Sequence, residues 1–159
     1  MKEFKLLALS PEEKATLLDT FDLVDGLATN HIEKLVIFLK AYSVSSGLTI
    51  IHEGEKGHFF CLVCKGQVDI VKADVKGALK TVNSLGAGKI IGEIAFFDNV
   101  TSSASVMAKQ DVTLLIMDRT SFSAFCADSP YAALQITLKL LKYVSQRLRQ
   151  TTGKLVDFL

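Results

Sequence analysis

A Cys-x-x-Cys pair is the part of this chain whose residue types and spacing point most directly to chemistry. Cys61 and Cys64 have the separation found in zinc sites and redox-active thiol pairs. They lie, however, in the apolar and aromatic-rich run 59–64, which is typical of a β-strand. Side chains three positions apart on a strand point to opposite faces of the sheet. We therefore expect two buried thiols that share no metal ion.

A second group of potential metal ligands lies in a glycine-rich turn. Its members are His52, Glu53, Glu55 and His58. The group lacks the paired strand histidines and the later histidine of a metal-binding β-barrel enzyme, so we expect a solvated loop. Elsewhere no nucleophile–base pair and no pair of carboxylates suggests catalysis. We expect no enzyme activity and no metal site.

The composition is that of an ordinary folded protein. A chain of 159 residues can form one domain, residues 1–159, with a substantial core. The net charge of +1 offers no basic excess for nucleic acid. No apolar run reaches the about 18–20 residues that span a bilayer, so we expect no membrane partner. The absence of a signal-peptide pattern and the odd count of three cysteines favour reduced thiols in the cytoplasm.

Three segments of different periodicity must position any functional residues. Residues 1–40 are expected to be helical, with Ser-Pro-Glu-Glu at 10–13 as a start signal. Residues 41–118 alternate short β-prone runs with glycine turns, as in a small barrel or sandwich. Residues 119–159 return to helix. The expected strands are Thr49–His52, Phe59–Cys64, Gln67–Lys72, Leu79–Leu85, Ser103–Ala108 and Val112–Asp118.

A long helix is expected at the end of the chain. After a short helix at Thr120–Asp128, Ser129-Pro130 restarts the chain and a long helix runs toward Gln150. A leucine stripe of this kind usually packs on its own domain, but further apolar residues leave a second seam open for a partner. The stripe consists of Leu134, Leu138, Leu141 and Leu148, and the further residues are Leu140 and Val144.

The ordered glycine motifs give the chain a resemblance to a known family. Gly-Glu-Ile-Ala at 92–95 is followed by a short loop and Ser-Ser-Ala-Ser-Val at 102–106, and matching turns occur at 47–57, 65–68 and 85–93. Together these segments resemble, nearly end to end, the cyclic nucleotide-binding domain of the catabolite activator, kinase regulatory subunits and gated channels. The resemblance implies an α+β fold, with an antiparallel, jelly-roll-like β-roll flanked by N-terminal helices and a long C-terminal helix.

The same resemblance assigns ligand-binding roles to two short segments. In the family, the glutamate at the position of Glu93 binds the ribose 2′-hydroxyl. Backbone amides near Ile94 and Ala95 meet the cyclic phosphate, and a hydroxyl at the position of Ser103 adds a hydrogen bond. The implied ligand-binding residues are Gly92, Glu93, Ile94, Ala95, Ser102, Ser103 and Ala104.

The phosphate-binding arginine of the family is replaced here by Ser102. An arginine–phosphate contact contributes about 1.5–3 kcal/mol. Without it we expect Glu93 to stand uncompensated near an anionic ligand, a repulsion of roughly 2 kcal/mol at ~7 Å and a dielectric of ~20. The two effects together weaken binding about a thousandfold. We expect Arg119 to hold structure, while Arg147 and Arg149, far along the last helix, stay open as replacements.

These observations favour a non-catalytic regulatory module with weak or altered cyclic nucleotide binding. Its expected ligand is a cyclic mononucleotide or another small anion, with no other cofactor. Its output would pass through the C-terminal helix to a protein partner or a homodimer. Too few residues follow Gln150 for a helix-turn-helix, so we expect no DNA partner. A degenerate domain that binds no nucleotide and serves as an interaction scaffold remains the alternative, and a cupin-like metal enzyme is a third.

Overall fold

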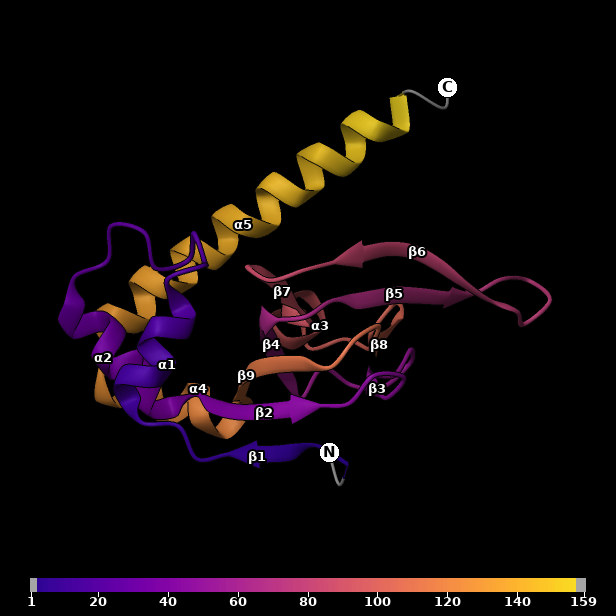
Figure 1. The fold of residues 1–159 in the computed structure, drawn as a ribbon. Coiled ribbons are helices and arrows are strands. Elements are labelled where there is room, and N and C mark those ends of the chain that lie inside the picture. Colours follow the sequence, from indigo (N-terminus) through magenta and orange to yellow (C-terminus); the bar gives the residue numbers. More distant parts are fainter. Residues whose placement is uncertain (1–2, 157–159) are drawn as a thin grey trace.

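The computed structural model describes residues 3–156, with side chains up to residue 154. Figure 1 shows two β-sheets with helices gathered at one end and a long C-terminal helix that projects from them. The elements of the described part are β1 Lys5–Leu7, α1 Pro11–Leu18, α2 Thr29–Phe38, β2 Lys40–Val44, β3 Thr49–Ile51, β4 Phe59–Lys65, β5 Val68–Ala73, β6 Leu79–Leu85, β7 Lys89–Ile91, α3 Glu93–Asp98, β8 Ser105–Ala108, β9 Val112–Asp118, α4 Arg119–Asp128 and α5 Pro130–Val156.

The strands form two sheets in which every pairing is antiparallel. One sheet has the order β1-β2-β9-β4-β7, and the other has the order β3-β8-β5-β6. A hydrophobic cluster with members from both sheets lies between them. This arrangement confirms the expected α+β fold with an antiparallel β-roll, N-terminal helices and a long C-terminal helix.

Strand β4 is buried on both faces and separates two hydrophobic cores. Leu62 and Cys64 belong to the core beneath the helices, whereas Cys61 and Val63 belong to the core between the sheets. The prediction that the two thiols point to opposite faces is confirmed. Burial raises the pKa of both thiols, that of Cys64 to about 12. Among the described residues, no group of three or more acidic, histidine or cysteine side chains is placed to hold a metal ion.

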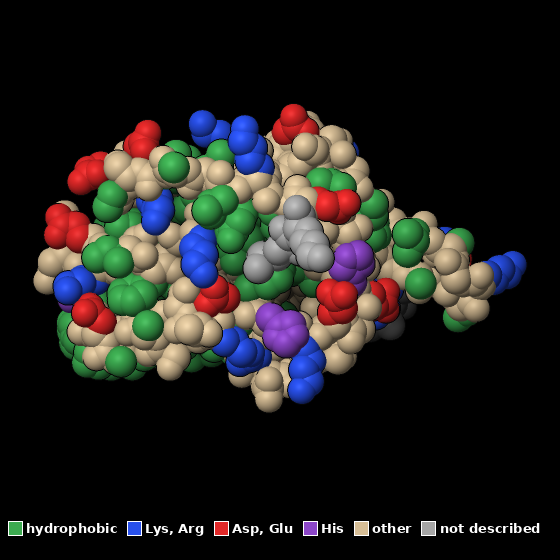
Figure 2. Space-filling view, turned by 90° about the horizontal axis from the view of Figure 1, so that it is seen from below, with side chains coloured by type: hydrophobic (Ala, Val, Ile, Leu, Met, Phe, Trp, Pro, Cys, Tyr) green, Lys and Arg blue, Asp and Glu red, His purple; other side chains and the backbone are tan. Residues whose placement is uncertain are grey.

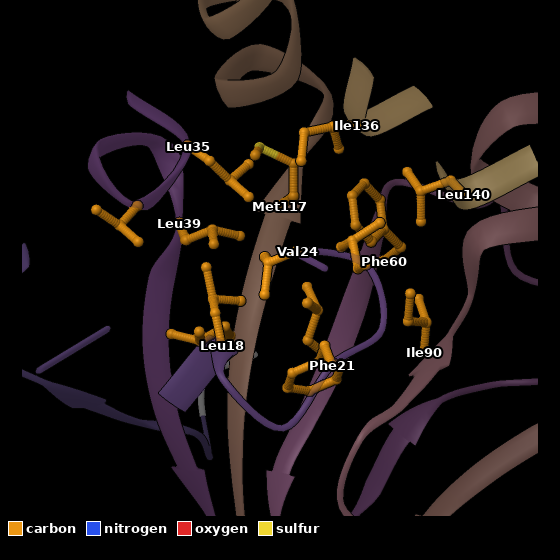
Figure 3. Close-up of a cluster of buried hydrophobic side chains, with 14 of the residues drawn as sticks. Leu18, Phe21, Val24, Leu35, Leu39, Phe60, Ile90, Met117, Ile136 and Leu140 are labelled. Atoms are coloured by element: carbon orange, nitrogen blue, oxygen red, sulfur yellow. The ribbon is translucent and has the colours of Figure 1, made fainter. Parts of the chain in front are cut away.

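The core beneath the helices joins both ends of the chain to the first sheet. Figure 3 shows Leu18, Leu35 and Leu39 of the N-terminal region facing Met117 of β9, with Ile136 and Leu140 of α5 beside them. Because α5 is built into this core, its first half is held firmly against the sheet. Its second half extends beyond the other helices (Figure 1).

The leucine stripe of α5 does not pack on its own domain, unlike most such stripes. Its four members, Leu134, Leu138, Leu141 and Leu148, are 50–67% exposed. Ile136 and Leu140 form the buried side instead, with exposed fractions of 2%. The helix also continues past Gln150 to Val156, and residues 157–159 lie outside the described residues.

The expected helical segment 1–40 contains a strand. The capping box at Ser10 and Glu13 is present and begins α1 as predicted. Lys5–Leu7, however, forms the edge strand β1 and pairs with β2. Its three residues are too few to show a period, and the pairing partner is supplied from far along the chain. The expected set of strands also lacks Lys89–Ile91, which is equally short, and the five-residue strand Lys40–Val44.

The outer surface carries charges of both signs. On the face shown in Figure 2, acidic and basic side chains are interspersed rather than gathered by sign. The β5–β6 hairpin extends away from the body (Figure 1), and all but one residue of β6 are exposed. No helix in the described part is both long enough and apolar enough to cross a bilayer.

Candidate functional site

A cavity of about 180 Å³ lies where the second sheet meets α3 and α5. Its walls are mostly apolar, with Ile51, Ile91 and Val106 on the strands that form its floor. All seven residues that the sequence implicated line this one cavity: Gly92, Glu93, Ile94, Ala95, Ser102, Ser103 and Ala104. The two segments, which are separated by the end of α3 and the loop 99–101, are therefore brought together by the fold.

Gly92 allows the chain to turn from β7 into α3. It has a left-handed φ of 80°, and a Cβ at this position would lie 2.8 Å from the Ile51 side chain and 3.1 Å from the Phe59 carbonyl oxygen. A larger residue would be strained in its backbone and crowded in space. The turn places Glu93 at the first position of α3, where the residue is 1% exposed.

Ser102 is buried in the cavity wall and held by its backbone. Its N–H donates to the Glu55 carbonyl oxygen at 2.8 Å, and its own carbonyl oxygen accepts from the Gly54 N–H at 2.8 Å. Ser103, by contrast, is exposed, and so is Ile94 on α3. The position that carries an arginine in the family is thus rigid and inward, but it presents only a hydroxyl.

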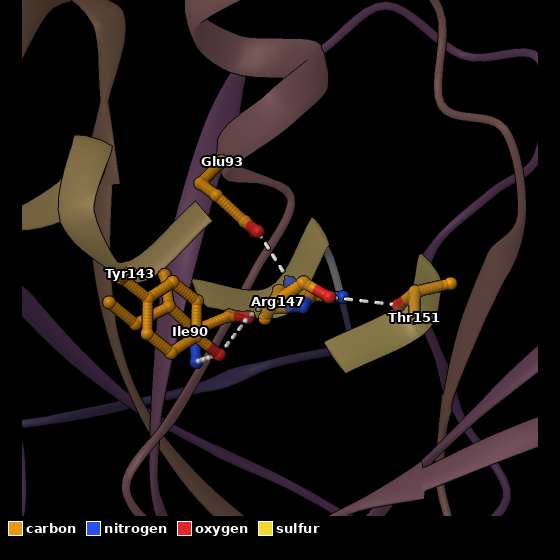
Figure 4. A network of polar contacts seen from close by, with 5 residues as sticks. All are labelled: Ile90, Glu93, Tyr143, Arg147 and Thr151. Atoms are coloured by element: carbon orange, nitrogen blue, oxygen red, sulfur yellow. Dashed lines mark hydrogen bonds and ion pairs between the residues drawn. The ribbon is translucent and has the colours of Figure 1, made fainter. Parts of the chain in front are cut away.

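Arg147 of α5 also lines the cavity, and it is one of the two arginines that the sequence left open as a replacement cation. Its Nη1 lies 2.5 Å from Glu93 Oε1 and donates also to the Ile90 carbonyl oxygen at 3.4 Å. Figure 4 shows Arg147 beside Ile90 and Tyr143, with Glu93 above and a dashed line joining it to the guanidinium. The Tyr143 hydroxyl accepts a hydrogen bond from the Ile90 N–H at 3.0 Å. Two consecutive turns of α5 are therefore hydrogen-bonded to β7.

The expectation that Glu93 lacks a cation is wrong. Burial raises the pKa of this carboxyl, and the charge of Arg147 together with its hydrogen bond opposes that shift. Arg147, a candidate replacement cation far along α5, does reach Glu93, and the spacing of its neighbours on the helix explains how. Leu140, Tyr143 and Arg147 follow one another by three and four positions, which places them on one face of the helix.

Three other cationic residues, Arg119, Lys109 and Arg149, do not line the cavity. Arg119 donates from Nη2 to the Phe96 carbonyl oxygen at 2.7 Å and stacks on the Phe96 ring, as expected for a residue that holds structure. Lys109 pairs with Asp69 on the surface at 3.6 Å. Arg149 is exposed and does not line the cavity. Glu93 and Arg147 are therefore the ionisable residues among the described residues that line it.

Comparisons with known proteins agree with this geometry. The chain is 26% identical over 137 residues to a CRP-like cAMP-activated global transcriptional regulator of Mycobacterium tuberculosis, covering 86% of this chain and 59% of that protein. It is 34% identical over 105 residues to a cAMP-dependent protein kinase regulatory subunit of Aspergillus fumigatus, covering 66% of this chain and 25% of that one. The chain thus spans well under two thirds of the length of these curated relatives.

Solved structures share the fold. A cyclic nucleotide-binding domain from Methylobacillus flagellatus KT superposes with a TM-score of 0.86 at 20% identity, covering 99% of this chain and 90% of that one. The family model described as "Cyclic nucleotide-binding domain" matches residues 42–129, which include most of the β-roll, α3 and α4. The chain therefore belongs to the cyclic nucleotide-binding domain family.

Proposed function

We propose that this chain is a single-domain, non-catalytic regulatory module whose cavity binds a cyclic nucleotide weakly or with altered selectivity. The observation that carries the proposal is that all seven implicated residues line one cavity, and that α5 contributes Arg147 to its wall. A ligand in this cavity touches both the β-roll and the helix that leaves it. Occupancy would therefore change how firmly α5 is held.

The replacement of the family arginine by Ser102 supports weak or altered binding. The lost arginine–phosphate contact amounts to about 1.5–3 kcal/mol, or roughly a 10- to 150-fold change in affinity. The additional repulsion expected from Glu93 is offset, because Arg147 neutralises that carboxylate. We therefore expect affinities of order ten to a hundred times weaker than a domain with the arginine, rather than a thousand times.

The exposed stripe on α5 supports an output through a second copy of the chain. Leu134, Leu141 and Leu148 are seven residues apart, and Leu138 falls four after the first, as d and a positions of a heptad do. The same register places Lys142 and Arg149 at successive e positions. In an antiparallel pair these like charges would face each other, whereas in a parallel pair they face uncharged g positions. A parallel homodimer is thus the favoured arrangement.

The apolar surface continues from this stripe onto α3. A groove with a volume of about 410 Å³ runs between the two helices, and Ile94, Phe97 and Leu141 contribute exposed apolar surface beside it. A partner helix that covers the stripe would also cover this groove. Because Ile94 directly follows Glu93, such a partner would lie against the short helix that forms one wall of the ligand cavity. This neighbourhood supports a link between ligand and assembly.

The alternative is a domain that binds no nucleotide and serves only as an interaction scaffold. The contact that favours it is the Glu93–Arg147 pair, since the carboxylate that would accept a ribose hydroxyl is already bonded within the protein. Titration calorimetry with cyclic AMP, cyclic GMP and cyclic dinucleotides separates the two functions. Binding of a cyclic mononucleotide that Ser102→Arg tightens supports the regulatory module. No heat with any of them, and none after Ser102→Arg, supports the scaffold.

A further inference from the structure

The positive charge of the cavity comes from α5, whereas the seven implicated residues lie in the segments 92–95 and 102–104. Of the described residues that line the cavity, Arg147 is the one with a positive charge and Glu93 the one with a negative charge. Domains with an arginine at the position of Ser102 carry the same two charges on one segment of the β-roll. This cavity also has one cation and one anion, but its cation lies on α5.

The Arg147 guanidinium has hydrogen-bonding capacity to spare. Its contacts with Glu93 and the Ile90 carbonyl oxygen both use Nη1. Nη2 and Nε bond to none of the described residues, and the side chain is 38% exposed although it lines the cavity. A planar guanidinium can hold a carboxylate with one edge and a phosphate with another. The ion pair with Glu93 therefore orients the guanidinium and leaves its other N–H donors available for a ligand.

We propose that Arg147 binds the anionic group of the ligand in place of the arginine missing at Ser102. The proposal rests on the proposed function, since it assigns a residue to the same cavity. It adds that the ligand is clamped by the helix itself. A phosphate held by Arg147 bridges α5 to the cradle at Ser102 and Ser103, whereas a phosphate held by the cassette would leave α5 free to move. Selectivity for anionic over neutral ligands then comes from α5.

The opposite role for the same contact would be a latch that keeps ligands out. If Arg147 merely occupied Glu93, removing the guanidinium would free the carboxylate and tighten binding. If Arg147 holds the anion, removing it weakens binding of charged ligands and spares neutral ones. The two roles thus predict changes of opposite sign for one substitution.

The test is titration calorimetry of the full chain with cyclic GMP, cyclic AMP and the neutral nucleosides guanosine and adenosine. Arg147→Gln should weaken the cyclic nucleotides by about 10- to 100-fold and the nucleosides by less than about threefold. Arg149→Gln, on an exposed residue of the same helix, is the matched control and should change neither. Arg147→Lys keeps the charge beside Glu93 and should lose an intermediate amount of cyclic nucleotide affinity. Because this variant keeps the ion pair, it should fold even if the glutamine variant does not, and the test still gives a result.

A relocated arginine completes the test. Ser102→Arg combined with Arg147→Gln returns the cation to the cassette and should restore cyclic nucleotide affinity, while hydrogen exchange of α5 no longer responds to the ligand. Unchanged or tighter cyclic nucleotide binding by Arg147→Gln overturns the proposal, as does an equal loss for nucleosides. In either case a wild-type chain that still binds leaves the proposed function standing. If no ligand binds the wild-type chain, the proposed function and this assignment fail together.

Discussion

Replacing Arg147 with glutamine should destabilise the protein by an amount that depends on pH. Glu93 is 1% exposed, and its ion-pair partner among the described residues is Arg147. Burial raises the pKa of this carboxyl, so folding takes up a proton between the unfolded and folded pKa values. The contribution of the Glu93 carboxyl to the free energy of unfolding therefore falls as the pH rises from its unfolded to its folded pKa. Without Arg147 the folded pKa rises further, and the window extends upward.

The size of the loss has a ceiling set by protonation. Once its partner is gone, Glu93 can take a proton rather than remain a buried anion. Holding a carboxyl of ordinary pKa about 4.3 protonated costs about 3.7 kcal/mol at pH 7 and about 1.6 kcal/mol at pH 5.5. Breaking a fully buried pair costs about 3–5 kcal/mol, and the 38% exposure of the Arg147 side chain reduces this. We expect a loss of about 2–3 kcal/mol at pH 7 and less than about 1.6 kcal/mol at pH 5.5.

Urea unfolding at both pH values and one protein concentration measures this difference. The double variant Glu93→Gln/Arg147→Gln removes both charges and should recover most of the stability at pH 7, while Arg149→Gln should stay within about 0.5 kcal/mol of wild type. A loss for Arg147→Gln that is equal at the two pH values would refute the reasoning. So would a double variant no more stable than the single one at pH 7.

Four further substitutions or treatments test other parts of the structure. Gly57→Ala places a Cβ 2.3 Å from the Ala95 carbonyl carbon, so we expect a loss of unfolding free energy above about 2 kcal/mol; a loss below half that value would count against the packing of α3. Leu141→Glu should convert a dimer to a monomer in light scattering, and unchanged mass would argue against the stripe. Ser10→Ala should cost about 1 kcal/mol through its helix cap, measured by urea unfolding, and no change would contradict that cap. Iodoacetamide should leave Cys64 unmodified in the folded protein, because burial raises its pKa to about 12; rapid labelling would contradict this.

The β-roll and the grouping of the candidate site residues could be predicted because their signals are local. The turn at Gly92 and the segment around Ser102 carry residue types that few other structures require, and their spacing brings all seven implicated residues to one cavity. The alternation of β4 likewise predicted that Cys61 and Cys64 lie on opposite faces. In each case the physical constraint acts within a few residues of the chain.

The contacts of α5 could not be predicted in the same way. The pair between Glu93 and Arg147 joins residues 54 positions apart, and it depends on how the helix crosses the sheet. The leucine stripe has a regular period, but a period does not tell which face of a helix is buried. Ile136 and Leu140 form that face instead. A count by threes and fours from Leu140 would have placed Arg147 on the same side.

If Arg147 binds the ligand, occupancy of the cavity around Glu93 changes how firmly α5 is held. Hydrogen exchange measured by mass spectrometry, with and without saturating cyclic GMP or cyclic AMP, tests it most directly. We expect ligand to slow exchange in the α5 segment 143–152 of the wild-type chain, and Arg147→Gln to abolish this change. Saturated binding with unchanged exchange in that segment would contradict it.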